Sequence, residues 1–99
     1  MIITGGLNVY PAEVETMIYG YAKVQEAVVF AIPDSKRGHV IGAAVVPRQG
    51  ETIVEKDLLS FLRTNLASFK VPQQIVIRES LPRTSSGKVI RDADTLLGN

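Results

Sequence analysis

The sequence predicts a small α+β domain with a central, mostly antiparallel sheet of about three strands, a short two-stranded element, and helices packed on one face of the sheet. Three observations support this prediction. The chain has 99 residues, which suits a single domain. Two segments carry apolar residues at helical spacing. Other segments are rich in β-branched residues and end at proline or at charged turns, as strands do.

The N-terminal part of the chain predicts a strand, a turn and a helix. Ile2-Ile3 begins an extended segment that Gly5-Gly6 interrupts and residues 7–10 continue. Pro11 suits the first turn of a helix, where its missing N–H is not needed. Gly20 is expected to end this helix. The apolar face follows the spacing i, i+3, i+4 and i+7 and consists of Val14, Met17, Ile18 and Tyr21.

A hairpin and a second helix are predicted in the middle of the chain. Residues 24–32 predict a buried strand, residues 34–38 a charged turn, and residues 40–46 a second strand that Pro47 ends. The two strands would form an antiparallel hairpin with a loop longer than two residues. Residues 54–66 predict the second helix. Its apolar stripe consists of Leu58, Phe61, Leu62 and Leu66.

The C-terminal part predicts one more strand, a polar loop and a short helix. Residues 74–78 alternate in polarity, which is typical of a strand. A polar loop follows at residues 82–88, and residues 91–97 predict the terminal helix. The residues expected to form most of the core are Val14, Ile18, Val28, Phe30, Val45, Leu58, Leu62 and Ile75.

The composition excludes several classes of function. A net charge of +1 gives no basic excess of the kind that nucleic-acid binding favours. The absence of cysteine excludes disulfides, thiolate metal sites and thiol catalysis, and we expect no metal site in this chain. The apolar runs are too short to cross a bilayer, and the N-terminus lacks the basic segment of a secretory signal. Because the chain opens on Ile2-Ile3 without a polar lead-in, we expect it to be cut from a longer polypeptide.

The polar loop with the sequence Leu81–Lys88 is the strongest candidate for a catalytic or binding role. It reads Leu-Pro-Arg-Thr-Ser-Ser-Gly-Lys, so a glycine lets the backbone turn tightly beside a lysine that projects a cation. Such a cation suits a phosphate or carboxylate whose charge develops during a reaction. A P-loop is excluded, because Pro82 and Val89 stand where a glycine and a hydroxyl are needed. On these residues alone, a solvated turn with an incidental lysine is an equal alternative.

The segment Gly5–Pro11 is the second candidate. Two glycines before a helix allow the backbone to approach a ligand closely. Taken alone, a tight strand-to-helix turn is the better interpretation. The segment is not G-x-G-x-x-G, so a dinucleotide-binding fold is not indicated.

Four motifs follow one another in a fixed order along nearly the whole chain. They are Gly5–Glu15 (Gly-Gly-Leu-Asn-Val-Tyr-Pro-Ala-Glu-Val-Glu), Ala31–Asp34, Phe69–Pro72 and Leu81–Arg91. Together they resemble the C-terminal domain of the adenylate-forming superfamily, which includes acyl- and aryl-CoA synthetases, luciferases and peptide-synthetase adenylation domains. The first motif is most similar to that of fatty-acid–CoA ligases. Four ordered motifs are more specific than any one of them.

The resemblance implies that residues 1–99 are the C-terminal lid domain of an AMP-forming acyl-CoA ligase. The N-terminal domain, which binds most of the ATP, the Mg²⁺ and the acid, and the hinge residue are not in the sequence. ATP and Mg²⁺ would be the cofactors, and CoA would be the co-substrate. The substrate would be a carboxylic acid, and we expect a fatty acid. The partner would be the enzyme's own N-terminal domain. We expect the fragment alone to be inactive, and the full-length enzyme to be cytoplasmic or peripheral to a membrane, with no transmembrane segment.

The resemblance also implies roles for particular residues. Lys88 would be the catalytic residue of adenylation, since a fixed cation can hold two anions against each other. The residues implied to support the adenylation loop are Asn8, Arg83, Thr84, Ser86 and Gly87. The residues implied to contact CoA are Gly5, Gly6, Leu7, Arg63 and Lys70. For Arg63 and Lys70, a solvated charge at the end of a helix is the alternative.

The sequence departs from the family pattern at two positions. Ile3 stands where some relatives place a second functional lysine, and His39 stands where glutamate is common, in a turn where we expect a surface residue. An alternative function is the lid of an adenylation domain that loads an acyl or aminoacyl group onto a carrier protein. A non-catalytic interaction domain that kept the fold is a third interpretation, and the intact motifs count against it.

Overall fold

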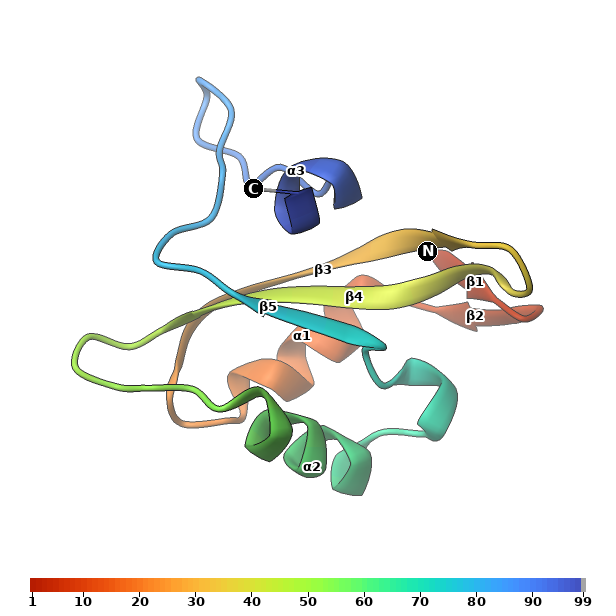
Figure 1. The fold of residues 1–99 in the computed structure, drawn as a ribbon, viewed down its shortest axis with the longest axis horizontal. Coiled ribbons are helices and arrows are strands. Elements are labelled where there is room, and N and C mark those ends of the chain that lie inside the picture. Colours follow the sequence, from red (N-terminus) through yellow and green to blue (C-terminus); the bar gives the residue numbers. More distant parts are fainter. Residues whose placement is uncertain (99) are drawn as a thin grey trace.

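A computed structural model describes residues 1–98, and Asn99, the predicted end of the domain, lies outside the described residues. The elements in chain order are β1 (Ile2–Thr4), β2 (Leu7–Val9), α1 (Pro11–Tyr19), β3 (Val24–Asp34), β4 (Gly38–Pro47), α2 (Glu55–Asn65), a short 3-10 helix (Ser68–Lys70), β5 (Gln74–Ile77) and α3 (Ala93–Gly98) (Figure 1). The predicted α+β class is confirmed. None of the helices in residues 1–98 combines the length and the apolar character needed to cross a membrane.

The hairpin of β3 and β4 is longer than predicted. Its ladder continues through Pro33 to the pair Asp34 and Gly38, which were expected to form the turn. The side chain of Asp34 explains why the strands can extend so far. Its carboxylate accepts the backbone N–H groups of Lys36 and Arg37 at 3.1 and 2.8 Å, which closes a short turn without further backbone bonds.

The main sheet has three strands in the order β3-β4-β5 and is mixed. The longer pairing, between β3 and β4, is antiparallel as predicted. β5 runs parallel to β4, with Ile75 opposite Ala43. This parallel pairing follows from the crossover, because the chain leaves β4, passes through α2 and returns alongside β4 in the same direction. β1 and β2 form a separate antiparallel pair.

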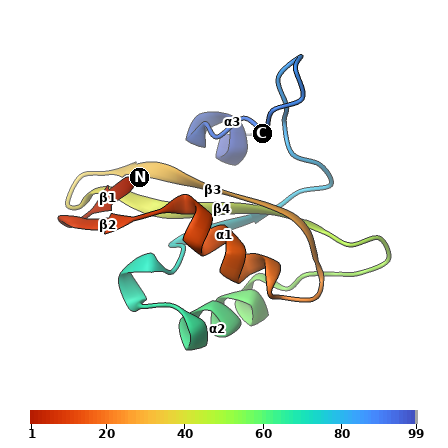
Figure 2. The same cartoon turned by 180° about the vertical axis from the view of Figure 1, so that it is seen from behind.

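The prediction that the helices pack on one face of the sheet was wrong. α1 and α2 lie against one face, whereas α3 and the segment before it lie against the other (Figures 1 and 2). The physical reason lies in β3, where Val28, Val29 and Phe30 are buried in succession. Because successive side chains of a strand point to opposite faces, such a run requires cover on both sides.

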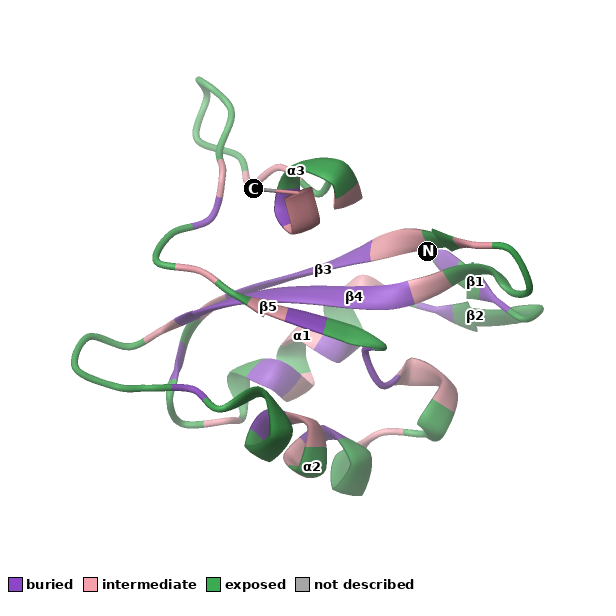
Figure 3. Cartoon of the chain, viewed as in Figure 1, coloured by how far each residue is buried: buried purple, intermediate pink, exposed green. Residues whose placement is uncertain are grey.

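The core therefore has two parts, one on each face of the sheet (Figure 3). The larger part joins α1 and α2 to the sheet and includes Val14, Ile18, Val45, Leu58, Leu62 and Ile75, all of which were predicted as core. The smaller part lies under α3 and consists of Val28, Phe30, Ala44, Val46, Leu81 and Leu96. The predicted core residues Val28 and Phe30 thus belong to the second face.

Phe30 occupies a position that only a glycine opposite it permits. Its cross-strand partner is Gly42. A Cβ atom added to Gly42 would lie 2.7 Å from Cε2 of Phe30 and 2.7 Å from Cδ1 of Ile32. The ring therefore fills the space above Gly42 and is almost completely buried.

Side chains of α1 cover the free edge of β3. The N–H of Ala27 donates to the hydroxyl of Tyr19 at 3.0 Å, and the N–H of Val29 donates to the carboxylate of Glu15 at 2.8 Å. The carbonyl of Val29 accepts a hydrogen bond from Arg91 at 2.9 Å. Glu15 and Tyr19 are one helical turn apart, so they lie on the same side of α1 and meet the strand edge together.

Candidate functional site

The segment of residues 82–90, here called the lysine loop, is a small hairpin that projects from the body of the domain (Figures 1 and 2). The N–H of Thr84 donates to the carbonyl of Lys88 at 2.8 Å, and the N–H of Ile90 donates to the carbonyl of Pro82 at 2.9 Å. Arg83 and Val89 are opposite each other in an isolated antiparallel bridge. The loop thus has two hydrogen-bonded limbs.

The tip of the lysine loop has a defined turn. The N–H of Gly87 donates to the carbonyl of Thr84 at 2.9 Å, and Gly87 has a φ of 90°, which favours glycine. The hydroxyl of Thr84 lies 3.0 Å from that of Ser86 and accepts the N–H of Lys88 at 3.2 Å. The structure thereby brings together Thr84, Ser86 and Gly87, which the sequence predicted as support for the loop.

Lys88 leaves this turn as an exposed side chain. The ion pairs within residues 1–98 involve Lys70, Arg83 and Arg91, and do not include Lys88. An ammonium group on a fixed backbone, without an anionic partner in the described residues, is able to bind an anion that comes from outside the domain.

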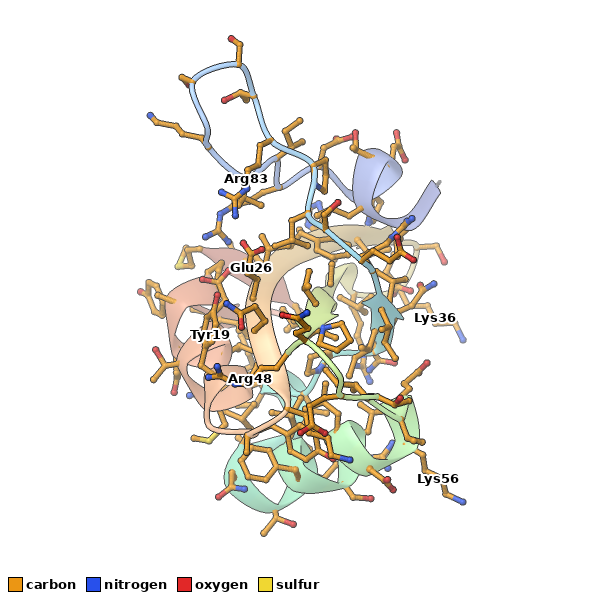
Figure 4. The ribbon with its side chains drawn as sticks, turned by 90° about the vertical axis from the view of Figure 1, so that its left-hand side faces the viewer. Tyr19, Glu26, Lys36, Arg48, Lys56 and Arg83 are labelled. Atoms are coloured by element: carbon orange, nitrogen blue, oxygen red, sulfur yellow. The ribbon has the colours of Figure 1, made fainter. Side chains whose placement is uncertain are left out.

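Ion pairs join the base of the lysine loop to the body. Arg83 pairs with Glu26 of β3 and also donates to the carbonyl of Gly87 at 3.0 Å. Figure 4 shows Arg83 and Glu26 pointing toward each other. Just beyond the other limb, Arg91 pairs with Glu15 of α1, with Nη1 2.6 Å from Oε2. The sequence predicted a role for Arg83 but none for Glu15, Glu26 or Arg91.

The Gly-Gly segment lies at the other end of the domain from the lysine loop (Figure 1). Gly5 and Gly6, with φ of 57° and 83°, make the tight turn between β1 and β2, and the N–H of Gly5 donates to the carbonyl of Arg37 at 3.0 Å. Gly5 and Leu7 line a hollow of about 410 Å³ together with Thr4, Arg37, Ser68, Phe69 and Gln73. The two candidate segments therefore form separate sites.

The remaining predicted residues lie near this second site or on its borders. Arg63 lines an adjacent hollow of about 240 Å³, which shares Ser68 and Gln73 with the first. Lys70 is paired with Glu13 at 2.8 Å, so its charge is already partly used. Asn8 lies on β2, apart from the lysine loop that it was predicted to support (Figure 1).

Neither site offers a ligand set for a metal ion. Within residues 1–98, no three histidine, aspartate or glutamate side chains lie close enough together to hold one. Mg²⁺ therefore does not fit the residues that the structure describes.

Residues 13–88 match the model of a family described as the AMP-binding enzyme C-terminal domain. The chain belongs to this family. The matched region begins in α1 and ends at Lys88, so it includes most of the lysine loop but not the segment Gly5–Pro11.

Relatives of this AMP-binding enzyme C-terminal domain include several CoA ligases. It is 47% identical over 91 residues to a feruloyl-CoA synthase from Amycolatopsis, which is 92% of the chain and 18% of that protein. It is 43% identical over 91 residues to a long-chain-fatty-acid–CoA ligase from Bacillus subtilis, which is 92% of the chain and 16% of that protein. The chain thus spans less than a fifth of the length of these relatives.

Solved structures of similar proteins share the fold of this C-terminal domain. A fatty acyl-CoA synthetase from Mycobacterium tuberculosis superposes with a TM-score of 0.80 at 41% identity, over 91% of the chain and 18% of that structure. The ATP-bound MatB from Rhodopseudomonas palustris superposes with a TM-score of 0.87 at 35% identity, over 100% of the chain and 20% of that structure.

Replacement of Gly87 by alanine tests whether the shape of the lysine loop matters. A Cβ atom at this position meets no atom within 4 Å, so the substitution introduces only backbone strain at a φ of 90°. This strain costs about 1–3 kcal/mol, and the exposed loop is expected to relieve it by changing shape. In the full-length enzyme, G87A should slow acyl-adenylate formation, measured as acid-dependent exchange of pyrophosphate into ATP, by about tenfold.

Gly50→Ala is the matched control for this substitution. Gly50 also has a positive φ, of 81°, and open space around its missing Cβ, but it lies in the turn between β4 and α2. G50A carries similar strain and should leave adenylation unchanged. Equal losses of adenylation in both variants would show that general strain, and not the loop, is responsible.

Proposed function

We propose that this domain is the mobile C-terminal part of an ATP-dependent, AMP-forming acid–CoA ligase, and that fatty acids are its acid substrates. The observation that carries the proposal is the lysine loop, which holds an ammonium group without an anionic partner in residues 1–98 at the tip of a hydrogen-bonded hairpin. The names of the relatives support the ligase class, and the fatty-acid ligases among them support the acid.

In the first half-reaction, the acid's carboxylate would attack the α-phosphate of ATP and displace pyrophosphate. Both reactants are anions, so their approach is opposed by charge repulsion. The ammonium of Lys88 would lie between them and stabilise the charge that develops on the transferred phosphate. The two backbone groups of Lys88 would be held in place while this occurs, since its carbonyl accepts the N–H of Thr84 and its N–H donates to the hydroxyl of Thr84.

In the second half-reaction, the thiol of CoA would attack the acyl adenylate and displace AMP. The hollow lined by Gly5 and Leu7 would accept the narrow arm of CoA, because the glycine lets the ligand approach the backbone closely. Arg63 in the adjacent hollow would meet CoA phosphate groups, and Lys70 would do so only by leaving Glu13. Since the two sites lie at different ends of the domain, each half-reaction would use a different surface.

ATP and the acid would bind mainly to the N-terminal domain, together with Mg²⁺, for which this chain has no ligand set within residues 1–98. The proposal is tested with the purified full-length enzyme, ATP, CoA and a series of carboxylic acids that includes long-chain fatty, aromatic and dicarboxylic acids. We expect acid-dependent release of AMP and pyrophosphate and formation of a fatty acyl-CoA. The isolated chain should release neither product.

Three results would contradict parts of this proposal. Thioester formation on a carrier protein, without activity toward CoA, would replace the CoA ligase with the carrier-loading alternative. A preference for aromatic or dicarboxylic acids over fatty acids would contradict the proposal that fatty acids are the substrates, but not the proposed ligase class. Acid-dependent pyrophosphate release by the isolated chain would show that it contains an ATP site of its own.

A further inference from the structure

The two limbs of the lysine loop are attached to the same strand of the sheet. The first limb is tied through Arg83 to Glu26, which lies on β3. The chain just beyond the second limb is tied through Arg91 to the carbonyl of Val29, also on β3, and to Glu15 of α1. Both ends of the loop are therefore attached to β3, at Glu26 and at Val29.

Glu15 makes the stronger of these attachments. Its carboxylate accepts hydrogen bonds from both terminal nitrogens of Arg91, at 2.6 and 3.3 Å. It also accepts one from the N–H of Val29 at 2.8 Å. The side chain of Glu15 is 15% exposed and that of Glu26 is 34% exposed, whereas the arginines are about equally exposed, at 52% for Arg91 and 44% for Arg83. A two-pronged pair with a guanidinium fixes direction as well as distance. An ion pair with a more buried carboxylate is also less screened by salt than one with a more exposed carboxylate.

A projecting hairpin amplifies movement at its base. The hydrogen bonds of the lysine loop lie between its own limbs, so they preserve its shape but do not fix its direction relative to the sheet. Direction is set at the base, by the burial of Leu81 and by the two arginine–glutamate pairs. A small rotation at the base displaces the ammonium group of Lys88 at the tip.

Resting on the proposed role of Lys88, we propose that Glu15 is a positioning residue for adenylation: through Arg91 it fixes the direction of the lysine loop. Glu26 does the same for the other limb through Arg83, with a smaller effect because its carboxylate is more exposed and accepts one hydrogen bond from the arginine instead of two. Neither glutamate touches the reacting atoms. Each acts through an arginine that flanks Lys88 in the chain.

Glu15→Gln separates this role from the role of Glu15 in the fold. The glutamine keeps an oxygen that accepts the N–H of Val29, so the edge of β3 stays covered. It loses the charge that pairs with Arg91. Arg91→Gln removes the same pair from the other side, and Glu51→Gln is the control, since Glu51 is an exposed glutamate in the turn after β4 without an ion pair in residues 1–98.

The test uses the full-length enzyme and measures each half-reaction separately. We expect E15Q and R91Q to slow acyl-adenylate formation by about 10- to 100-fold, since misplacement of a reacting group by about 1 Å costs up to about 100-fold. Thioester formation from supplied acyl adenylate should stay at the wild-type rate. The double variant E15Q/R91Q should be no slower than either single variant, because both remove one interaction. E51Q should be unchanged.

Hydrogen exchange reports on the loop without reference to activity. The N–H groups of Thr84, Gly87 and Ile90 donate hydrogen bonds within the lysine loop, and their exchange should be the same in E15Q as in E51Q, because the loop changes direction and keeps its shape. Faster exchange, which would mean that the loop loses its shape, or an equal loss of both half-reactions in E15Q, would overturn the positioning role, whatever Lys88 does. Full adenylation by Lys88→Ala, measured in parallel, would instead overturn the proposed function of the loop.

Discussion

Replacing Lys88 with alanine in the full-length enzyme is expected to slow acyl-adenylate formation by about 10²- to 10³-fold, the cost of removing one preorganised charge from a transition state. The backbone hydrogen bonds of the loop involve the N–H and carbonyl of Lys88 and not its side chain, so the turn should remain intact. The loss would then report the missing ammonium group. The measurement is acid-dependent exchange of pyrophosphate into ATP.

The second half-reaction provides the internal control for Lys88→Ala. Thioester formation from supplied acyl adenylate should remain close to the wild-type rate, because it would use the surface around Gly5 and Leu7. Lys56→Ala removes another exposed lysine, on α2, and should affect neither half-reaction (Figure 4). Normal adenylation with impaired thioester formation in K88A would show that the lysine serves the second step.

Replacing Phe30 with alanine is expected to lower the free energy of unfolding of this chain by about 3–5 kcal/mol, because it removes a large buried side chain and leaves a cavity. Domains of this size are stable by only about 5–15 kcal/mol in total. The cavity would be hard to refill, because the residue opposite Phe30 is Gly42, which has no side chain. The measurement is urea unfolding followed by circular dichroism.

Ile77→Ala is the control for Phe30→Ala. Ile77 is a large apolar residue on β5, but its side chain is 41% exposed, so its loss should cost less than about 1 kcal/mol. A similar cost for both substitutions would mean that the second core contributes little. Leu81, the residue just before the lysine loop, packs in the same cluster as Phe30, so this cluster also anchors the start of the loop.

Local patterns in the sequence were sufficient to predict the helices and strands and most of the larger part of the core. The helical spacing of Val14 and Ile18, and of Leu58 and Leu62, places each pair on the buried face of its helix. These patterns depend on residues a few positions apart, so they can be read from a single chain. The residue types of the lysine loop are unusual and contiguous, but on their own they left a solvated turn as an equal alternative, and only the resemblance to family motifs favoured a functional loop.

Features that depend on distant residues could not be predicted in this way. The pair of Glu15 and Arg91 joins residues 76 positions apart, and neither residue is unusual for an exposed helix or loop. The parallel direction of β5 depends on how α2 crosses the sheet. The placement of α3 on the second face was indicated only indirectly, by the uninterrupted apolar run at Val28, Val29 and Phe30.

The side chains that cover the edge of β3 also protect the domain from aggregation. An uncovered strand edge offers N–H and carbonyl groups to which a strand of another molecule can add. Here the hydroxyl of Tyr19 and the carboxylate of Glu15 already occupy the N–H groups of Ala27 and Val29. A second molecule would have to displace α1, together with the core beneath it, before it could extend the sheet at β3. The movement that we propose for this domain could therefore expose this side to solvent without polymerisation through the edge of β3.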